Sequence, residues 1–261
     1  MNFTDLGLSE QTIKAIDEFG IKEPTTIQAD VIPSILEGKD IFAIAPQGCG
    51  KTMSYVLPIL DIIHRKKAQT ILIITPNSNS SVMISDQLAI FNKYHLENET
   101  VPERDEDVNQ EANVIIGAPD LLLEVIEAGK ANISQTDILV VDDINLIKKN
   151  KQLDNLEKIL SLLPAEKQNI VYTNRRSKET QSVLEKILKT PEEIKVDKNK
   201  EQEAQLSAKQ VSTNPQRNKN KQVFSSIIDE EAVKVAEKNK SFNGKVPGFI
   251  LIKGILAEET N

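Results

Sequence analysis

A phosphate-binding loop is the clearest chemical feature of the sequence. It reads APQGCGKT from Ala45 to Thr52, with alanine where the strict phosphate-loop pattern begins with glycine. Gly48 and Gly50 let backbone N–H groups turn toward phosphate oxygens. Lys51 would reach the β- and γ-phosphates of a nucleotide, and the Thr52 hydroxyl would bind Mg²⁺. The predicted nucleotide site comprises Ala45, Pro46, Gln47, Gly48, Cys49, Gly50, Lys51 and Thr52.

An acidic pair supplies the second half of such a site. Asp142 and Asp143 follow the apolar run ILVV. They would therefore stand at the carboxyl edge of a parallel sheet, where ligands bind in α/β folds. Asp142 would hold Mg²⁺ together with Thr52. The same pair would also suit the N-terminus of a helix as a cap, and the pattern leaves both interpretations open.

Short apolar runs alternate with helical segments along residues 1–196. No run alternates apolar with polar residues, which is typical of strands covered on both faces. The segments between them carry apolar residues at three- and four-residue spacing, as helices do. The pattern predicts a parallel α/β sheet with helices on both faces, and a strand and a helix that flank the phosphate loop argue against a chance match. The expected strands are 40–45, 70–75, 113–118, 137–143 and 169–173, with a short run ending at Val196; the expected helices are 28–36, 52–63, 120–128, 153–163 and 178–188.

The amino-acid composition argues against several classes of protein. The formal net charge of −7 argues against strong nucleic-acid binding, which depends on Lys and Arg. Cys49 is the only cysteine, so an internal disulfide and a multi-cysteine zinc site are excluded. His64 and His95 are too isolated in the sequence to suggest metal ligation or a catalytic triad. We see neither a signal peptide nor an apolar run long enough to span a bilayer, and expect a cytoplasmic protein with no membrane partner.

Residues upstream of the phosphate loop resemble the Q motif of the DEAD-box RNA helicases. Gly20, Pro24-Thr25 and Ile27-Gln28 match the pattern G-x-x-x-P-T-x-I-Q, and Phe3 stands where that family has an isolated aromatic residue. The similarity extends to Val196 and implies the family's first RecA-like domain, a P-loop NTPase fold. It also implies ATP with Mg²⁺ as ligands. Gln28 would hydrogen-bond the adenine edge, and Phe3 would stack on the ring.

The motifs around the reacting phosphate depart from the family pattern. Where the family reads D-E-A-D, this chain has Asp142-Asp143-Ile144-Asn145. The general base would then be Asp143, one methylene shorter than Glu. A displacement of about an ångström can cost on the order of a hundredfold in rate. Where the family reads S-A-T, this chain has Thr173-Asn174-Arg175, which puts the coupling of hydrolysis to strand separation in doubt.

The RNA-facing motifs depart further. The arginines of the family's P-T-R-E-L-A and T-P-G-R motifs are missing from the segments that begin at Pro76 and Ala118, and Asp120 adds a negative charge. Residues 197–261 are too few for the family's second RecA-like domain, which supplies arginine fingers. We expect an ATP-binding helicase-like protein with weak RNA binding, whose ATPase activity is low or needs a partner protein. The alternative is a non-catalytic module that regulates RNA metabolism through protein partners.

Residues 197–261 differ in composition from the rest of the chain. Residues 197–222 are polar and are expected to form a disordered linker after a RecA-like domain at 1–196. Residues 223–261 would be a small segment of unknown fold, with a helix near 227–237. Its apolar run GFILIKGIL would add a strand to a sheet edge, either its own or a partner's.

Overall fold

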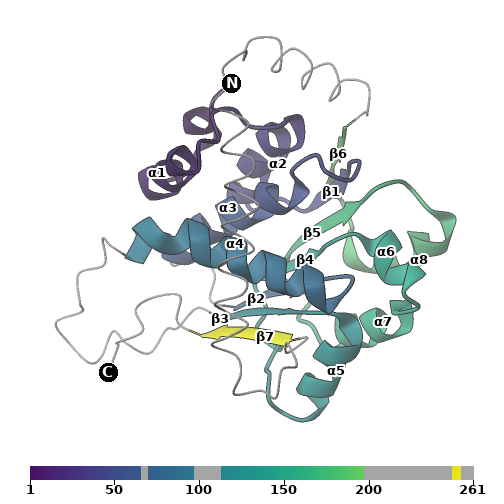
Figure 1. Ribbon diagram of the computed structural model, residues 1–261. Helices are drawn as coiled ribbons and strands as arrows, with labels where there is room; N and C mark the ends of the chain where they lie inside the picture. The colour runs from purple at the N-terminus through teal and green to yellow at the C-terminus, as the bar shows by residue number, and fades with distance from the viewer. Residues whose placement is uncertain (66–69, 97–112, 197–248, 254–261) are drawn as a thin grey trace, which may run out of the picture. The chain divides into compact units, whose positions relative to one another are not determined.

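A computed structural model describes residues 1–65, 70–96, 113–196 and 249–253. In these residues the chain forms a seven-stranded sheet in the order β6-β1-β5-β4-β2-β3-β7 (Figure 1). Strands β1 to β6 pair in parallel, and β7 pairs antiparallel with β3. The predicted parallel α/β sheet is confirmed. The strands are β1 (Ile41–Ile44), β2 (Thr70–Ile74), β3 (Asn113–Gly117), β4 (Ile138–Val141), β5 (Gln168–Thr173), β6 (Glu192–Lys195) and β7 (Phe249–Lys253).

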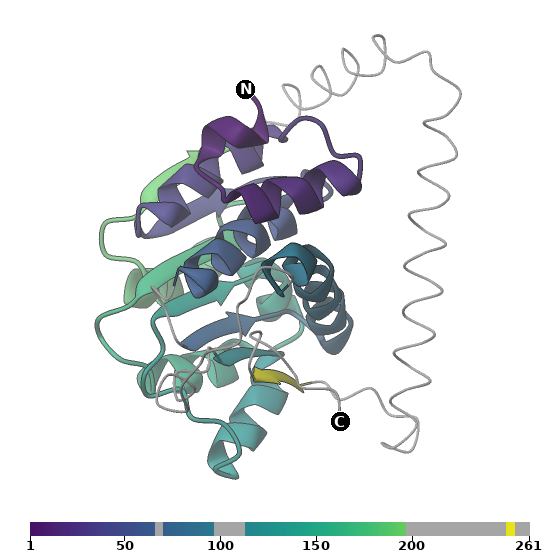
Figure 2. The ribbon, with the colours of Figure 1, turned by 90° about the vertical axis from the view of Figure 1, so that its left-hand side faces the viewer.

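Helices cover both faces of the sheet, because side chains alternate between the faces along each strand. Ile41 and Ala43 pack with α1–α4, whereas Phe42 and Ile44 pack with α5–α8. The two layers can be followed in Figure 1 and, after a quarter turn, in Figure 2. The helices are α1 (Glu10–Glu18), α2 (Thr26–Leu36), α3 (Lys51–His64), α4 (Ser78–Leu96), α5 (Pro119–Glu127), α6 (Ile144–Lys149), α7 (Leu153–Ser161) and α8 (Lys178–Ile187), after a 3₁₀ turn at Phe3–Leu6.

The five predicted helices correspond to α2, α3, α5, α7 and α8. Three further helices, α1, α4 and α6, were not predicted. Helix α4 begins in a run of Ser and Asn, which are weak helix formers. Asn77 compensates for this, because its Oδ1 accepts a hydrogen bond from Ser80 N at 3.0 Å. The predicted linker and the helix near 227–237 lie outside the described residues.

Strand β7 comes from the apolar run near the C-terminus. It pairs with the whole of β3, with Phe249 opposite Gly117 and Lys253 opposite Asn113. The sequence left open whether this run joins a sheet of its own chain or a sheet of a partner. In the structure it joins the sheet of its own chain. Strand β7 therefore belongs to the same compact unit as residues 1–196.

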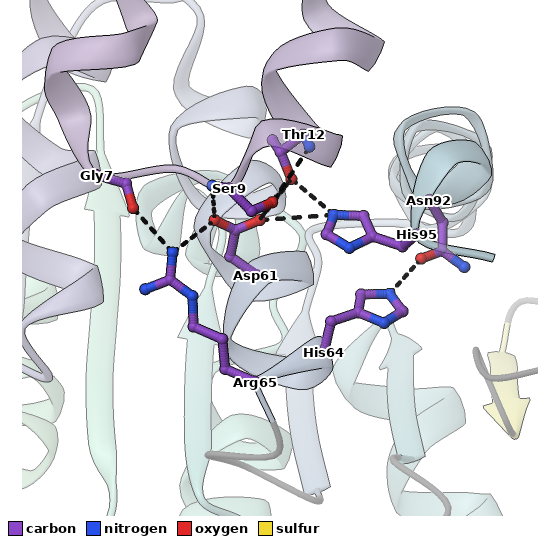
Figure 3. A network of polar contacts seen from close by, with 8 residues as sticks. All are labelled: Gly7, Ser9, Thr12, Asp61, His64, Arg65, Asn92 and His95. Carbon is purple, nitrogen blue, oxygen red and sulfur yellow. Dashed lines mark hydrogen bonds and ion pairs between the residues drawn. The ribbon is translucent and has the colours of Figure 1, made fainter. Parts of the chain in front are cut away.

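A buried polar network joins α1, α3 and α4 around Asp61, which is 0% exposed. Its carboxylate accepts hydrogen bonds from Ser9 N (2.5 Å), Ser9 Oγ (2.7 Å), Thr12 Oγ1 (2.5 Å) and Arg65 Nη2 (3.2 Å) (Figure 3). His95 Nε2 lies 2.8 Å from Thr12 Oγ1 and 3.6 Å from the carboxylate. The network therefore fixes α1 against the helix that follows the phosphate loop.

The two histidines meet in this network although they are distant in the sequence. Their rings are stacked, with centroids 4.0 Å apart and planes at 8°, and His64 Nε2 lies 2.6 Å from Asn92 Oδ1 (Figure 3). The expectation that His64 and His95 are isolated is thus wrong, because α3 and α4 pack side by side. Among the described residues no cluster of three His, Cys, Asp or Glu side chains is suited to a metal ion.

His95 should make the fold less stable as the pH falls from 7 to 4. Burial and then the neighbouring His64 lower the pKa of His95 from 6.5 to about 4. Between pH 6.5 and about pH 4, the His95 side chain binds a proton in the unfolded chain but not in the folded chain. Acid therefore favours unfolding. Urea unfolding at pH 7.5 and pH 5 should show a loss of about 1 to 2 kcal/mol from this group, after allowance for solvent screening.

The control for this measurement is His95→Gln, which cannot titrate. Its stability should change less than that of the wild type between the two pH values. An equal change in both proteins would show that other groups cause the pH dependence.

Candidate nucleotide site

The strand order brings the predicted site together. Strands β1, β5 and β4 are neighbours, so their carboxyl ends lie side by side. The phosphate loop follows β1, Asp142 follows β4, and Thr173 ends β5. Ala45 N donates to the carbonyl of Thr173 at 2.9 Å, and Asp142 N donates to that of Ile74 at 2.9 Å. The loop and the acidic residue thus share one edge of the sheet.

Two glycines shape the loop. Gly48 and Gly50 have φ of 83° and 91°, in the left-handed region that favours glycine. A Cβ on Gly50 would lie 2.6 Å from Gln28 Nε2, whereas a Cβ on Gly48 would meet nothing within 4 Å. Gly50 is the N-cap of α3. The N-terminus of this long helix therefore opens directly onto the loop, as an anion site requires.

The Lys51 ammonium is held by the loop itself. Its Nζ donates to the carbonyls of Ala45 (3.1 Å) and Pro46 (3.3 Å). Cys49 is 1% exposed, and its Sγ donates to the Pro46 carbonyl at 2.9 Å. A phosphate group would offer Lys51 a charged acceptor in place of two neutral carbonyls, and charge-assisted hydrogen bonds are the stronger kind.

Asp142 lies within electrostatic reach of Lys51. Burial raises the pKa of Asp142 to about 6, the charge of Lys51 opposes that rise, and Asp143 adds to it. A carboxyl group in this position gains from a nearby cation, because opposite charge favours the ionised form. The arrangement therefore suits a divalent cation between Asp142 and the start of α3.

Asp143 has a structural use of its own. It adopts φ of 56°, and its Oδ1 accepts a hydrogen bond from Leu146 N at 3.2 Å as the N-cap of α6. Aspartate is one of the few residue types that adopt this backbone conformation readily. The capping interpretation left open by the sequence is confirmed for Asp143.

Asn145 links the segments that follow β4 and β5. Its Nδ2 lies 2.8 Å from Thr173 Oγ1, 3.0 Å from Asn174 Oδ1 and 2.7 Å from the carbonyl of Arg175, all of which accept hydrogen bonds. A carboxylate at position 145 would repel the last two acceptors. The Asn145 amide and the Thr173-Asn174-Arg175 segment therefore form a chemically matched pair.

Gln28 and Phe3 are both buried, at 3% and 4% exposure. Gln28 Nε2 donates to the Gly50 carbonyl at 3.2 Å, and its Oε1 accepts from Thr25 N at 3.0 Å. Phe3 packs in the apolar core on the same face of the sheet as Cys49. The structure thus joins Gln28 to the phosphate loop and places Phe3 in the core.

The segments without the expected arginines are both helix starts. Asn77 caps α4, as described above, and Asp120 is exposed in the first turn of α5 after Pro119. Asp120 Oδ1 accepts from the adjacent Leu121 N at 2.9 Å. Both positions carry local helix-capping chemistry and no positive charge.

The sequence interpretation missed Tyr55, which is fully buried in the first part of α3. Its hydroxyl makes no hydrogen bond within the described residues. It follows Lys51 by four positions and Thr52 by three, a spacing that puts the three side chains on one face of a helix. This spacing is the signal from which Tyr55 could have been predicted.

These residues fit a magnesium–nucleotide ligand. Such a ligand needs room for its phosphates, a positive charge and oxygen ligands for the cation. Gly48 leaves the room, Lys51 carries the charge, and the side chains of Thr52 and Asp142 offer the oxygens. The unsatisfied hydroxyl of Tyr55 lies next to this set.

In the described part of the chain, no helix is both long enough and apolar enough to cross a membrane.

Comparisons with known proteins point to one family. The sequence profile of the DEAD/DEAH box helicases matches residues 25–183. The ATP-dependent RNA helicase DeaD of Buchnera aphidicola (subsp. Schizaphis graminum) is 29% identical over 206 residues, which are 76% of this chain and 34% of that protein. The DEAD-box ATP-dependent RNA helicase RhpA of Helicobacter pylori is 29% identical over 203 residues, 75% of this chain and 41% of that protein. The matched region is thus well under half the length of either relative.

Solved structures show the same fold. A DEAD box protein from the hyperthermophile Methanococcus jannaschii superposes with a TM-score of 0.66 at 24% identity, over 76% of this chain and 57% of that one. A hypothetical ATP-dependent RNA helicase from Sulfolobus tokodaii superposes with a TM-score of 0.61 at 22% identity, over 72% and 57%. The sheet and its helices are therefore RecA-like, as predicted.

Proposed function

This chain belongs to the DEAD/DEAH box helicase family, and we propose that it binds ATP with Mg²⁺ at the carboxyl edge of β1, β5 and β4. The shared sheet edge carries the proposal: the phosphate loop follows β1 and Asp142 follows β4, and these strands are separated by β5 alone. Lys51 and Asp142 are far apart in the sequence. A phosphate-binding cation and a cation-binding carboxylate at one sheet edge are what a magnesium–nucleotide complex requires.

Each residue has a proposed role. Lys51 and the backbone N–H groups of the loop bind the phosphates, and Thr52 and Asp142 hold Mg²⁺. Gln28 and Phe3 form the adenine side of the site, with Gln28 also linked to Gly50. When bound, Mg²⁺ would neutralise charge on the phosphates.

Hydrolysis is proposed to be weak or to depend on a partner. Asp143 is the candidate general base, although its carboxylate also caps α6. An arginine finger from a protein partner or from another domain would stabilise the charge of the transition state. RNA binding is proposed to be weak, since Ser78 and Leu121 stand where the family's arginines are expected and Asp120 adds a negative charge.

A second candidate function is a non-catalytic, regulatory module in RNA metabolism. The hydrogen bond from Leu146 N to the Asp143 carboxylate favours it, because a carboxylate committed to a helix cap is a poorer base. The two candidates differ in hydrolysis rather than in fold, so one binding measurement and one hydrolysis measurement separate them.

Equilibrium binding tests the proposed function. A fluorescent ATP analogue is titrated with the protein in Mg²⁺, and unlabelled ATP and GTP are used as competitors. We expect micromolar displacement by ATP and much weaker displacement by GTP, with the preference reduced in Gln28→Ala. A wild-type protein that binds neither nucleotide would contradict the proposal.

Asp143→Asn should separate the role of Asp143 as a helix cap from its proposed role as the general base. Asparagine caps helices as well as aspartate does and tolerates the same backbone conformation. We therefore expect unchanged thermal stability and unchanged ATP binding, but no ATP hydrolysis above background in a phosphate-release assay. If Asp143→Asn hydrolyses ATP at the wild-type rate, Asp143 is not the base.

A further inference from the structure

Two buried tyrosines pack together in the apolar core that also contains Cys49 of the phosphate loop. Tyr55 on α3 and Tyr172 on β5 are both 0% exposed. Their ring centroids are 5.3 Å apart, with the ring planes at 51°. The two side chains share the same apolar surroundings, so their hydroxyl groups can be compared directly.

The hydroxyl of Tyr172 is satisfied within the fold. It lies 2.7 Å from Ser54 Oγ, and Ser54 Oγ donates to the carbonyl of Lys51 at 2.6 Å. Because the single Ser54 proton goes to Lys51, the serine oxygen accepts from Tyr172. Tyr172 therefore has a structural hydrogen bond that supports the first turn of α3.

The hydroxyl of Tyr55 has no such bond among the described residues. A buried hydroxyl without a partner destabilises a fold, so its retention calls for an explanation. Burial raises the pKa of Tyr55 well above its ordinary value, and the charge of Asp142 raises it further. The side chains of Thr52 and Asp142 lie close enough to the phenol to affect this pKa as hydrogen-bond partners, yet neither meets full hydrogen-bond geometry in the ligand-free fold.

We propose that Tyr55 is a positioning residue for Mg²⁺, with a hydroxyl that accepts from Thr52 and donates to Asp142. This inference rests on the proposed function, in which Thr52 and Asp142 hold the cation. A phenol can accept one hydrogen bond while it donates another, so it can join these two groups. Carboxylates that bind metal ions are commonly held by such outer hydrogen bonds.

The proposal explains why the hydroxyl is unsatisfied without ligand. A Mg²⁺-bound Thr52 hydroxyl must point its proton away from the metal, and Tyr55 supplies an acceptor. The hydrogen bonds of Tyr55 thus form together with the loaded site.

The test compares Tyr55→Phe with Tyr172→Phe, each of which removes one buried hydroxyl. Binding of a fluorescent ATP analogue is measured at increasing Mg²⁺ concentrations and, separately, in EDTA. Tyr55→Phe should raise the Mg²⁺ concentration at half-maximal effect about tenfold and leave binding in EDTA unchanged. Tyr172→Phe should leave the Mg²⁺ midpoint unchanged.

Thermal unfolding without nucleotide provides a second readout. Tyr55→Phe should be at least as stable as the wild type, because no well-formed hydrogen bond of the ligand-free fold is lost, and Tyr172→Phe should be less stable. A lower melting temperature for Tyr55→Phe would show that the phenol is bonded in the ligand-free fold and would overturn the inference.

The outcomes distinguish this inference from the proposed function. A wild-type protein that binds the analogue with Mg²⁺ dependence, alongside Tyr55→Phe with the same Mg²⁺ midpoint, overturns the inference alone. A wild-type protein without nucleotide binding overturns the proposed function and the inference with it.

Discussion

Replacing Lys51 with alanine should weaken ATP binding at least about 30-fold. The ammonium would be the main charged partner of the phosphates, and the loss of one member of such a pair costs about 2 kcal/mol or more. Titration of a fluorescent ATP analogue in Mg²⁺ measures the effect. Because Lys51 donates to carbonyls of its own loop and to no other group in the described part of the chain, the fold should survive the change.

Lys186→Ala is the matched control for Lys51→Ala. Lys186 is an exposed lysine on α8 that pairs with Glu157, on the opposite face of the sheet from α3. It should bind the analogue as the wild type does. Equal affinities for Lys51→Ala and Lys186→Ala would mean that the loop does not bind phosphate.

Asp61→Ala should lower the free energy of unfolding by about 3 kcal/mol or more. The variant would remove the acceptor of the part-buried Ser9 N–H and hydroxyl and of the buried Thr12 hydroxyl, and the loss of such an acceptor is costly. It would also remove the ion pair with Arg65. Urea unfolding at pH 7.5 measures the loss, and Asp61→Asn should lose less because its amide oxygen still accepts.

Asp17→Ala is the control on α1. Asp17 is exposed, so its replacement should change stability by about 0.5 kcal/mol at most. A loss for Asp61→Ala no larger than that for Asp17→Ala would show that the network in Figure 3 contributes little to stability.

The sequence was informative where one residue type decides the local structure. Strands such as 71–74 are fully apolar, and no other element fits a short run covered on both faces. The phosphate loop was equally readable, because Gly48 and Gly50 are required by its backbone. These features predicted the parallel sheet and the place of the site.

The features that escaped prediction depend on contacts between distant segments. The stacking of His64 on His95 exists only because α3 packs on α4. The cap formed by Asp143 requires the backbone turn after β4, and the isolation of the Tyr55 hydroxyl requires knowledge of every neighbour. Neither hydrophobic periodicity nor motif spacing contains this information.

The pairing of β7 with β3 has a consequence for how the chain folds. The edge strand β6 carries charged residues at Glu192, Glu193 and Lys195, which discourage pairing with other chains. Strand β3, in contrast, presents the apolar run Val114, Ile115 and Ile116. Its partner β7 follows β4, β5 and β6 in the sequence, so β3 emerges from the ribosome long before β7 does.

Pairing across so long a stretch of chain is slow, since the loop must close before any contact forms. Until then β3 is an open template for aggregation. Strand β7 therefore protects the edge of β3 in the nascent domain, and the delay between the synthesis of β3 and that of β7 determines how long this edge is exposed.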